Sequence, residues 1–231
     1  MASTIADNLA AVRDSIAEAA QAAGRDPQEV TLIAVSKTKP AAAVAQALAA
    51  GQRVFGENRV QEALGKIEAV PPGAEWHLVG HLQSNKARQV PGKFSTVHSL
   101  DSPRLALALQ KQAAQAGVNL GVLIQLNLKG EASKGGVRDM AGLGALLQTV
   151  LDCPALSPRG LMTLPDPGYS EAETRRHFAE VRGLRDSLRA EFGLGPAFRE
   201  LSMGMSHDFA WAIAEGATMV RIGTAIFGAR P

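Results

Sequence analysis

The feature that most constrains the fold is a regular alternation of short apolar runs with longer segments of helical pattern. The first run, 30–36, is β-branched and almost wholly apolar, which is typical of a parallel strand covered on both faces. Further strand-like runs follow at about 53–55, 76–79, 96–98, 121–128, 160–163, 199–202 and 218–222. Eight strands alternating with helices predict an α/β protein, a closed (β/α)8 TIM barrel. A doubly wound open sheet is the alternative.

The segments between the runs predict helices. They lie at about 41–50, 58–69, 85–90, 101–117, 139–151, 170–192 and 208–215. A further amphipathic helix precedes the first strand, because apolar residues recur there at spacings of three or four, at Ile5, Leu9, Val12 and Ile16. Ser3 and Thr4 are its candidate N-caps. Since no linker, charge block or fixed repeat divides the chain, we expect one domain over residues 1–231 with an extra N-terminal helix.

Composition excludes several classes of protein. Hydrophobic residues make up 46% of the 231 residues, which provides enough apolar material for a large core. The formal net charge is +2 and the aromatic fraction is 4%, so platforms for stacking bases are scarce and we expect no nucleic-acid partner. The apolar runs are too short to cross a membrane, and we expect no membrane partner.

The cysteine count and the N-terminus indicate a cytoplasmic protein. Cys153 is the single cysteine and can form no internal disulfide. No HxH or HExxH spacing occurs, so we expect no metal site. The first 24 residues lack the features of a signal or transit peptide, which predicts that the mature protein begins at or near Met1.

Two loops have the chemistry of a phosphate site. In a barrel, phosphate is often held by the loops after strands seven and eight. The first of these loops has hydroxyls and small residues over Ser202–Ser206, a range that includes Met203, and the second has Gly223 and Thr224. Small residues let the backbone approach an anion, and hydroxyls donate to its oxygens. We therefore predict a phosphorylated ligand across both loops, although either loop alone could be a tight turn with a helix cap.

A lysine follows the first strand, which closes next to strand eight in a barrel. Lys37 lies in the segment Ser36-Lys37-Thr38-Lys39-Pro40. Such a lysine could snorkel to the surface, but beside a phosphate site it can form a Schiff base with a carbonyl ligand. Pyridoxal 5′-phosphate (PLP) has both an aldehyde and a phosphate. Lys37 is preferred to Lys39, because a residue before proline should already be leaving the barrel. Arg221, at the end of strand eight, could donate to a pyridine nitrogen and leave it unprotonated.

At these residues the chain resembles the pyridoxal phosphate homeostasis protein family, which is related to the barrel domain of alanine racemase. The matching segments follow one another along nearly the whole chain: Ala34–Pro40, Phe55–Asn58, Trp76–Lys86, Ser133–Gly136, Gly160–Leu164, Leu201–Ser206 and Arg221–Thr224. One departure is Arg59, where the family commonly has tyrosine. That departure affects any contact made by the aromatic ring, and leaves the lysine linkage as expected.

The resemblance implies a set of roles for these residues. PLP would be held as an aldimine on Lys37, with Arg221 facing the ring nitrogen and Asn58 near the ring. Phosphate contacts are implied for Ser202, Ser206, Gly223 and Thr224. The implied function is intracellular PLP (vitamin B6) homeostasis, with delivery of PLP to the apo forms of PLP-dependent enzymes.

The alternative function is a PLP-dependent amino-acid racemase or weak transaminase. Alanine racemase adds a C-terminal domain whose tyrosine acts as a second acid/base across a dimer. Here the single tyrosine is Tyr169, which we expect to be structural or solvent-facing, and His77 is expected to be a hydrogen-bonded core residue. We therefore predict a monomeric carrier with no catalytic residues.

Overall fold

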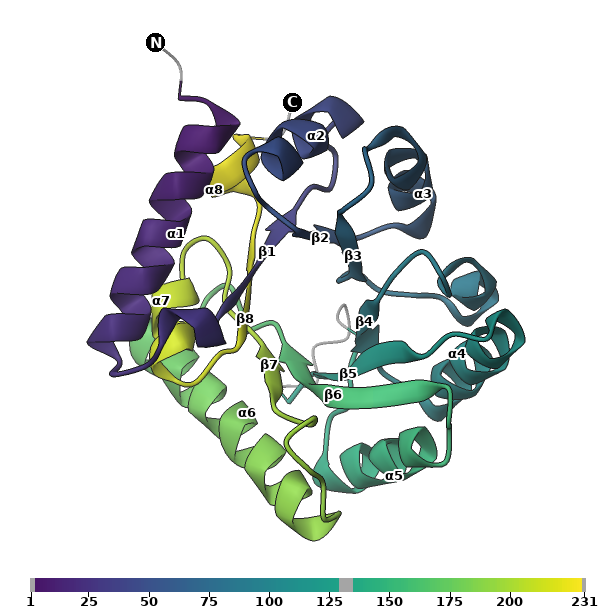
Figure 1. Ribbon diagram of the computed structural model, residues 1–231. Helices are drawn as coiled ribbons and strands as arrows, with labels where there is room; N and C mark the ends of the chain where they lie inside the picture. Colours follow the sequence, from purple (N-terminus) through teal and green to yellow (C-terminus); the bar gives the residue numbers. More distant parts are fainter. Residues whose placement is uncertain (1–2, 129–134, 230–231) are drawn as a thin grey trace.

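Eight parallel strands form a closed barrel in the order of the sequence (Figure 1). The structure is a computed structural model that describes residues 3–128 and 135–229. The strands are β1 (Thr31–Val35), β2 (Val54–Glu57), β3 (Glu75–Leu78), β4 (Thr96–Leu100), β5 (Leu120–Leu126), β6 (Leu156–Thr163), β7 (Glu200–Ser202) and β8 (Met219–Ile222). β1 pairs with β8, with Ile33 opposite Arg221, so the ring is closed. The predicted barrel is confirmed and the open sheet is wrong.

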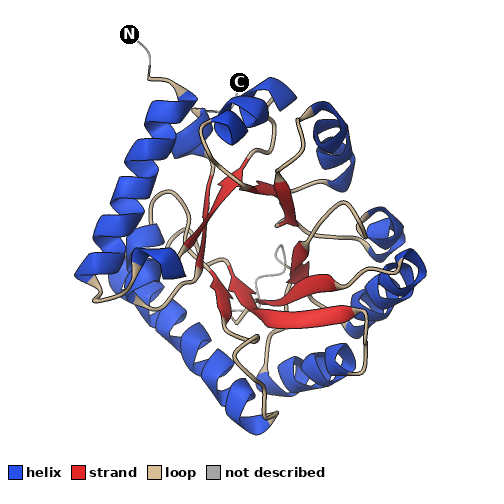
Figure 2. Cartoon of the chain, viewed as in Figure 1, coloured by secondary structure: helices blue, strands red, loops and turns tan. Residues whose placement is uncertain are grey.

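Helices surround the ring of strands (Figure 2). They are α1 (Ile5–Ala22), α2 (Ala41–Ala49), α3 (Val60–Ala69), α4 (Pro103–Ala116), α5 (Met140–Leu151), α6 (Glu171–Glu191), α7 (Phe209–Ala214) and α8 (Thr224–Phe227). Two short 3₁₀ helices, η1 (Pro27–Glu29) and η2 (Ser84–Gln89), complete the set of described helices. The helix predicted at 85–90 is thus a 3₁₀ helix. Within the described ranges, no helix has both the length and the apolar character needed to cross a membrane.

The predicted extra helix is α1, and it begins as the sequence indicates. Thr4 is the N-cap: its hydroxyl accepts from the amide of Asp7, whose carboxylate accepts from the Thr4 amide in return. The apolar stripe of α1 is buried, and the helix lies beside α7 and α8 (Figure 1). Asn8 Nδ2 donates to the carbonyl of Ile226 at 2.9 Å. The short helix α8 spans four residues, and α1 packs against both it and α7 on this side of the barrel.

Burial follows the strand pattern. Every residue of β5 is buried, as expected for a parallel strand covered on both faces.

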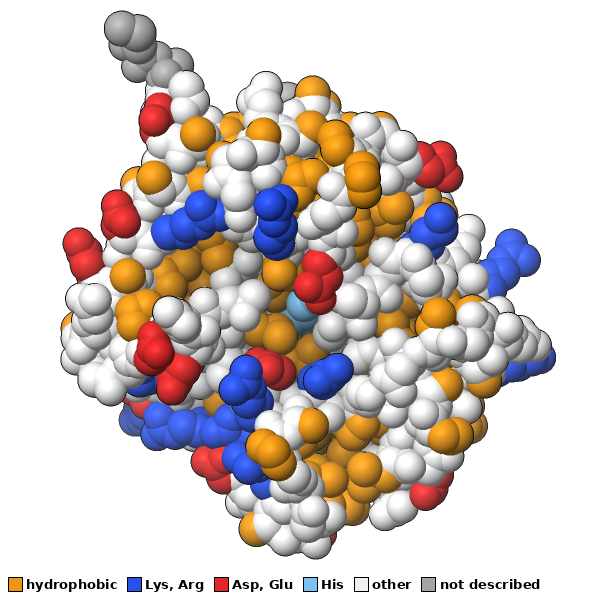
Figure 3. Space-filling view, in the orientation of Figure 1, with side chains coloured by type: hydrophobic (Ala, Val, Ile, Leu, Met, Phe, Trp, Pro, Cys, Tyr) orange, Lys and Arg blue, Asp and Glu red, His pale blue; other side chains and the backbone are white. Residues whose placement is uncertain are grey.

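On the face shown in Figure 3, Lys and Arg side chains alternate with Asp and Glu around the barrel opening.

Candidate functional site

A pocket of about 420 Å³ opens at the carboxyl ends of the strands, where barrel enzymes and binding proteins place their ligands. Six of the eight predicted site residues line it: Lys37, Asn58, Ser206, Arg221, Gly223 and Thr224. The other lining residues are Val35, Lys39, Val79, Leu164, Pro165, Pro167, Met205, His207 and Gly228. The segments after β1, β2, β3, β6, β7 and β8 thus meet around one hollow.

Lys37 lies in the loop directly after β1. The strand ends with a ladder bond from the Ser36 amide to the Gly56 carbonyl, at 3.0 Å. The chain then turns, and the Lys39 amide returns to the Ser36 carbonyl at 3.0 Å. Lys39 also lines the pocket, with its Nζ donating to the Ala229 carbonyl at 2.5 Å, so the expectation that Lys39 leaves the barrel is wrong. The turn after Ser36 keeps Lys39 at the edge of the pocket.

Arg221 brings a buried cation to the floor of the pocket. Arg221 lies in β8 and is only 5% exposed. Nη1 donates to Ser202 Oγ at 2.7 Å, and Nη2 donates to the Thr163 carbonyl at 2.9 Å. Burial lowers the pKa of Arg221 to about 10, partly offset by Asp208, so the guanidinium is still charged at neutral pH. The two hydrogen bonds fix its orientation.

Ser202 and Met203 lie below the pocket and do not line it. Ser202 ends β7 with its side chain in the barrel interior, and both residues are fully buried. The Ser202 hydroxyl is taken up by Arg221 and by His98. Contact between these two residues and a phosphate therefore stays a prediction. The predicted strand, 199–202, ends at the same residue as β7, and the difference lies in the direction of its last side chain, which points into the barrel interior, where Arg221 and His98 bond its hydroxyl.

A chain of hydrogen bonds runs from Arg221 through the barrel interior. His98 Nδ1 lies 2.8 Å from Ser202 Oγ, and His98 Nε2 lies 2.9 Å from His77 Nδ1. His77 Nε2 then reaches Glu75 Oε1 at 3.1 Å. Guanidinium can only donate, so Ser202 accepts from Arg221 and turns its own proton to His98. Each histidine then donates through Nε2, which confirms the prediction that His77 is a hydrogen-bonded core residue.

Electrostatics agree with that direction of donation. Burial, together with the nearby His77 and Arg221, holds the pKa of His98 well below its usual range, so His98 is neutral. The hydrogen bond from His77 lowers the pKa of Glu75 to about 2 against the opposing effect of its burial. Glu75 is therefore the anionic end of the chain and Arg221 its cationic end.

Glycines allow the loops around the pocket to approach one another. A Cβ at Gly80 would lie 2.3 Å from the Asn58 carbonyl oxygen, so the backbone after β3 can touch Asn58 only where no side chain intervenes. Gly204 has φ +93° and would place a Cβ 2.7 Å from Ala212 Cβ. Its carbonyl accepts from the Arg221 amide at 2.9 Å, which ties the loop that carries Ser206 to β8.

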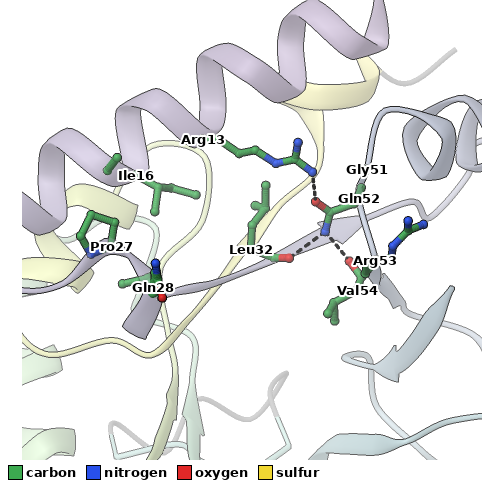
Figure 4. Close-up of a pocket in the computed structure, with 11 residues that line it drawn as sticks. Arg13, Ile16, Pro27, Gln28, Leu32, Gly51, Gln52, Arg53 and Val54 are labelled. Atoms are coloured by element: carbon green, nitrogen blue, oxygen red, sulfur yellow. Dashed lines mark hydrogen bonds between the residues drawn. The ribbon is translucent and has the colours of Figure 1, made fainter. Parts of the chain in front are cut away.

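A second hollow of about 380 Å³ lies between α1 and the amino ends of β1 and β2 (Figure 4). Its central polar side chain, Gln52, accepts from Arg13 Nη2 at 3.3 Å and donates to the carbonyls of Leu32 and Val54 at 2.8 Å. These bonds hold α1 and two strands together. Since the amino face of such barrels serves stability, we assign this hollow no chemistry.

Sequence reasoning missed part of the pocket wall. Leu164, Pro165 and Pro167 come from the segment after β6, and His207 follows Ser206. These residues could have been found from their position in the sequence, because each follows a strand and therefore lies at the same end of the barrel as Lys37. The matching segment Ser133–Gly136 begins with Ser133 and Lys134, which lie outside the described residues.

The comparisons with known proteins agree over the whole barrel. Residues 8–231 match the family described as alanine racemase, N-terminal domain. A pyridoxal phosphate homeostasis protein of Escherichia coli K12 is 49% identical over 230 residues, covering 98% of this chain and 97% of the relative. One from Pseudomonas aeruginosa is 51% identical over 229 residues, covering 99% and 96%.

Solved structures extend the comparison. PipY of Synechococcus elongatus, solved with PLP bound, has 41% identity and a TM-score of 0.85, covering 97% of this chain and all of that one. An alanine racemase of Bartonella henselae is 16% identical with a TM-score of 0.68, over 98% of this chain and 59% of that one. The racemase shows a shared fold alone. The family resemblance found in the sequence is confirmed.

Proposed function

Because the chain belongs to the alanine racemase N-terminal domain family, and within it to the pyridoxal phosphate homeostasis proteins, we propose that it binds PLP in the pocket at the carboxyl end of the barrel. Its role is to hold PLP through Lys37 and to release it for use elsewhere in the cell. PipY, a relative whose whole chain matches this one with the same fold, was solved with PLP bound.

The observation that carries this proposal is the charge of the pocket wall. The charged side chains of Lys37, Lys39 and Arg221 line it, and no Asp or Glu is found among the described lining residues. Hydroxyls of Ser206 and Thr224 lie in the same wall. Such a donor set favours an anion, and an amine among the donors suits an anion that also has a carbonyl group. PLP fits both requirements.

Each residue then has a separate task. When bound, PLP supplies an aldehyde that reacts reversibly with a lysine amine. Lys37 Nζ is the amine that we assign to this linkage, and Arg221, fixed by Ser202 and the Thr163 carbonyl, would offer its cation to the ring nitrogen. Ser206 and Thr224 would hold the phosphate, together with the backbone at Gly223. Asn58 would contact the ring.

The test compares two lysines of the same pocket. Purified wild-type protein, K37A and K39A are mixed with PLP, treated with borohydride and digested for peptide mass mapping. We expect the added mass on Lys37 in the wild type and in K39A, and no attachment in the pocket of K37A. Attachment to Lys39 in the wild type, or unchanged visible absorbance in K37A, would contradict the assignment.

The pocket also favours a carrier over an enzyme. Among the described lining residues the groups that could move a proton are the lysines and His207, whose side chain is 67% exposed. Tyr169 lies outside the lining and its ring packs edge-on against His177, with centroids 6.2 Å apart. A racemase needs a second base held against the substrate. We therefore propose that the protein turns over no amino acid.

That proposal is tested with amino acids in deuterated water. The holoprotein and K37A should exchange the α-proton of alanine at the same slow rate, as measured by NMR. Stereospecific exchange by the holoprotein well above K37A would establish the racemase-like alternative.

Three further properties belong to the same proposal. Transfer of PLP to apo forms of PLP-dependent enzymes is supported by the reversible chemistry of a lysine linkage, and is measured as recovered activity of an added apoenzyme. A monomer is supported by the scattered large exposed apolar side chains of the described residues, Leu107, Met140 and Leu151. Sedimentation tests it. A cytoplasmic location is supported by the buried thiol of Cys153, and fractionation tests it.

A further inference from the structure

A cluster of three charged residues lies directly beneath the loop that carries Lys37. Lys66 comes from α3 and is 6% exposed, and Glu57, at the end of β2, is fully buried. Lys66 Nζ lies 2.7 Å from Glu57 Oε1 and 2.7 Å from Glu62 Oε1. None of the three lines the pocket, and none of them was assigned a role from the sequence.

The cluster uses every proton of the Lys66 ammonium. Its third hydrogen bond goes to the Ser36 carbonyl at 2.6 Å, so the three donors of a protonated lysine each have an acceptor. Lys66 Nζ is thus held by three acceptors outside the pocket lining, and it is not a second amine for a carbonyl ligand.

The same cluster holds the chain on both sides of Lys37. Before it, the Ser36 hydroxyl donates to Glu57 Oε1 at 2.5 Å, and the Ser36 carbonyl accepts from Lys66. After it, the Thr38 amide donates to Glu62 Oε1 at 2.5 Å. Thr38 has φ +64°, a left-handed conformation that a β-branched residue rarely adopts. The bond to Glu62 therefore holds Thr38 in a strained backbone conformation, from which the loop would relax if the bond were lost.

We propose that Glu57, Lys66 and Glu62 are positioning residues that fix the backbone around Lys37, so that its amine meets the carbonyl of a bound ligand without a search through loop conformations. The proposal rests on the proposed function for the identity of the amine. It assigns a role to residues that do not line the pocket, and it predicts that they control the rate of PLP capture more than the affinity of the pocket.

Glu62 gives the sharpest test, because its side chain is 27% exposed and tolerates change. E62A removes the acceptor of the Thr38 amide, whereas E62Q keeps an oxygen at that place. We expect capture of PLP by Lys37, followed by stopped-flow absorbance, to slow about ten-fold or more in E62A and by less than about three-fold in E62Q. Pyridoxine 5′-phosphate, which has no aldehyde, should bind all three proteins equally well.

A second readout needs no cofactor. In the protein without PLP, hydrogen exchange of the Thr38 amide should be faster in E62A than in the wild type and E62Q. K66M should slow capture as E62A does. R25M is the control for loss of a partly buried cation away from the Lys37 loop: Arg25 Nη1 donates to two backbone carbonyls, those of Ile213 and Ala217. R25M should lower stability and leave the capture rate unchanged.

Two kinds of failure remain distinct. Wild-type capture at Lys37 with an equal rate in E62A would overturn the positioning role and leave the proposed function intact. A parallel loss of pyridoxine 5′-phosphate binding in E62A would also overturn it, because the cluster would then shape the pocket itself. Absence of capture at Lys37 in the wild type would overturn the proposed function, whereas the exchange experiment on Thr38 would still test the backbone contact.

Discussion

His98 Nδ1 lies 2.8 Å from Ser202 Oγ, and this contact joins the pocket to the opposite end of the barrel. On one side, Ser202 accepts from Arg221, which lines the pocket. On the other, His98 reaches the half-exposed Glu75 through His77. The orientation of the pocket's buried cation therefore depends on side chains from β3, β4 and β7 that do not line the pocket.

Removing the Ser202 hydroxyl should destabilise the protein. S202A takes away the acceptor of Arg221 Nη1 and the donor to His98 Nδ1, both of them buried. A buried donor left unpaired costs about 1–3 kcal/mol, and more when it is charged. We expect a loss of this size in the free energy of unfolding in urea.

The control is S157A, whose hydroxyl donates to Asn119 Oδ1 in an exposed pair. Its unfolding free energy should stay within about 0.5 kcal/mol of the wild type. Equal effects of S202A and S157A would show that the interior chain does not hold Arg221.

Stability should fall as the pH drops below about 6.5, and His98 is one cause. Its pKa is lowered in the folded state mainly by burial, and further by the electrostatic effect of His77 and Arg221. The unfolded chain therefore binds a proton at His98 that the folded chain does not, so the contribution is present above the unfolded pKa and is lost as the pH falls. In H98Q the slope of unfolding free energy between pH 7 and pH 5 should be shallower.

H207Q is the comparison for that slope, because the His207 side chain is 67% exposed. It should follow the wild type through the same pH series of urea unfolding curves. A wild-type slope in H98Q would assign the acid sensitivity to other groups.

The barrel was predictable because its signals are local and repeated. The run 30–36 and the fully buried β5 have the composition that parallel strands require, and Thr4 with Asp7 specifies the start of α1. Lys37, Arg221 and Thr224 could be placed in one site because parallel strands end at one face. Their position follows from chain order alone.

The interior networks were not predictable in the same way. The end of β7 at Ser202 agrees with the predicted strand, but the direction of the Ser202 hydroxyl is set by Arg221 and His98, which come from other strands of the barrel. The pairing of Glu57 with Lys66 depends on how α3 packs against β2. A weak signal was present, since Lys66 continues the three-residue spacing of the buried Val60 and Ala63.

Restoring the residue common in the family at position 59 should change little. Arg59 precedes α3, is exposed and does not line the pocket. Its charge is the smallest of the causes that lower the pKa of Glu62, after the bonds from Lys66 and the Thr38 amide. We expect R59Y to keep its unfolding free energy within about 0.5 kcal/mol, and to capture PLP at the wild-type rate. A much faster capture would indicate that a tyrosine ring at this position contacts the ligand.

Gly80 does not line the pocket, but a methyl group added there should displace Asn58, which does. The new Cβ would lie 2.3 Å from the Asn58 carbonyl oxygen and 2.6 Å from Asn58 Cα, so the backbone that carries Asn58 must shift. Overpacking of this kind costs about 1–3 kcal/mol. G80A should therefore lose that much unfolding free energy and bind PLP more weakly.

G183A is the matched control, because the new Cβ would meet nothing within 4 Å in the interior of α6. Its unfolding free energy should rise by about 0.5–1 kcal/mol, and its PLP binding should be unchanged. Wild-type affinity in G80A would show that the position of Asn58 does not matter to the ligand.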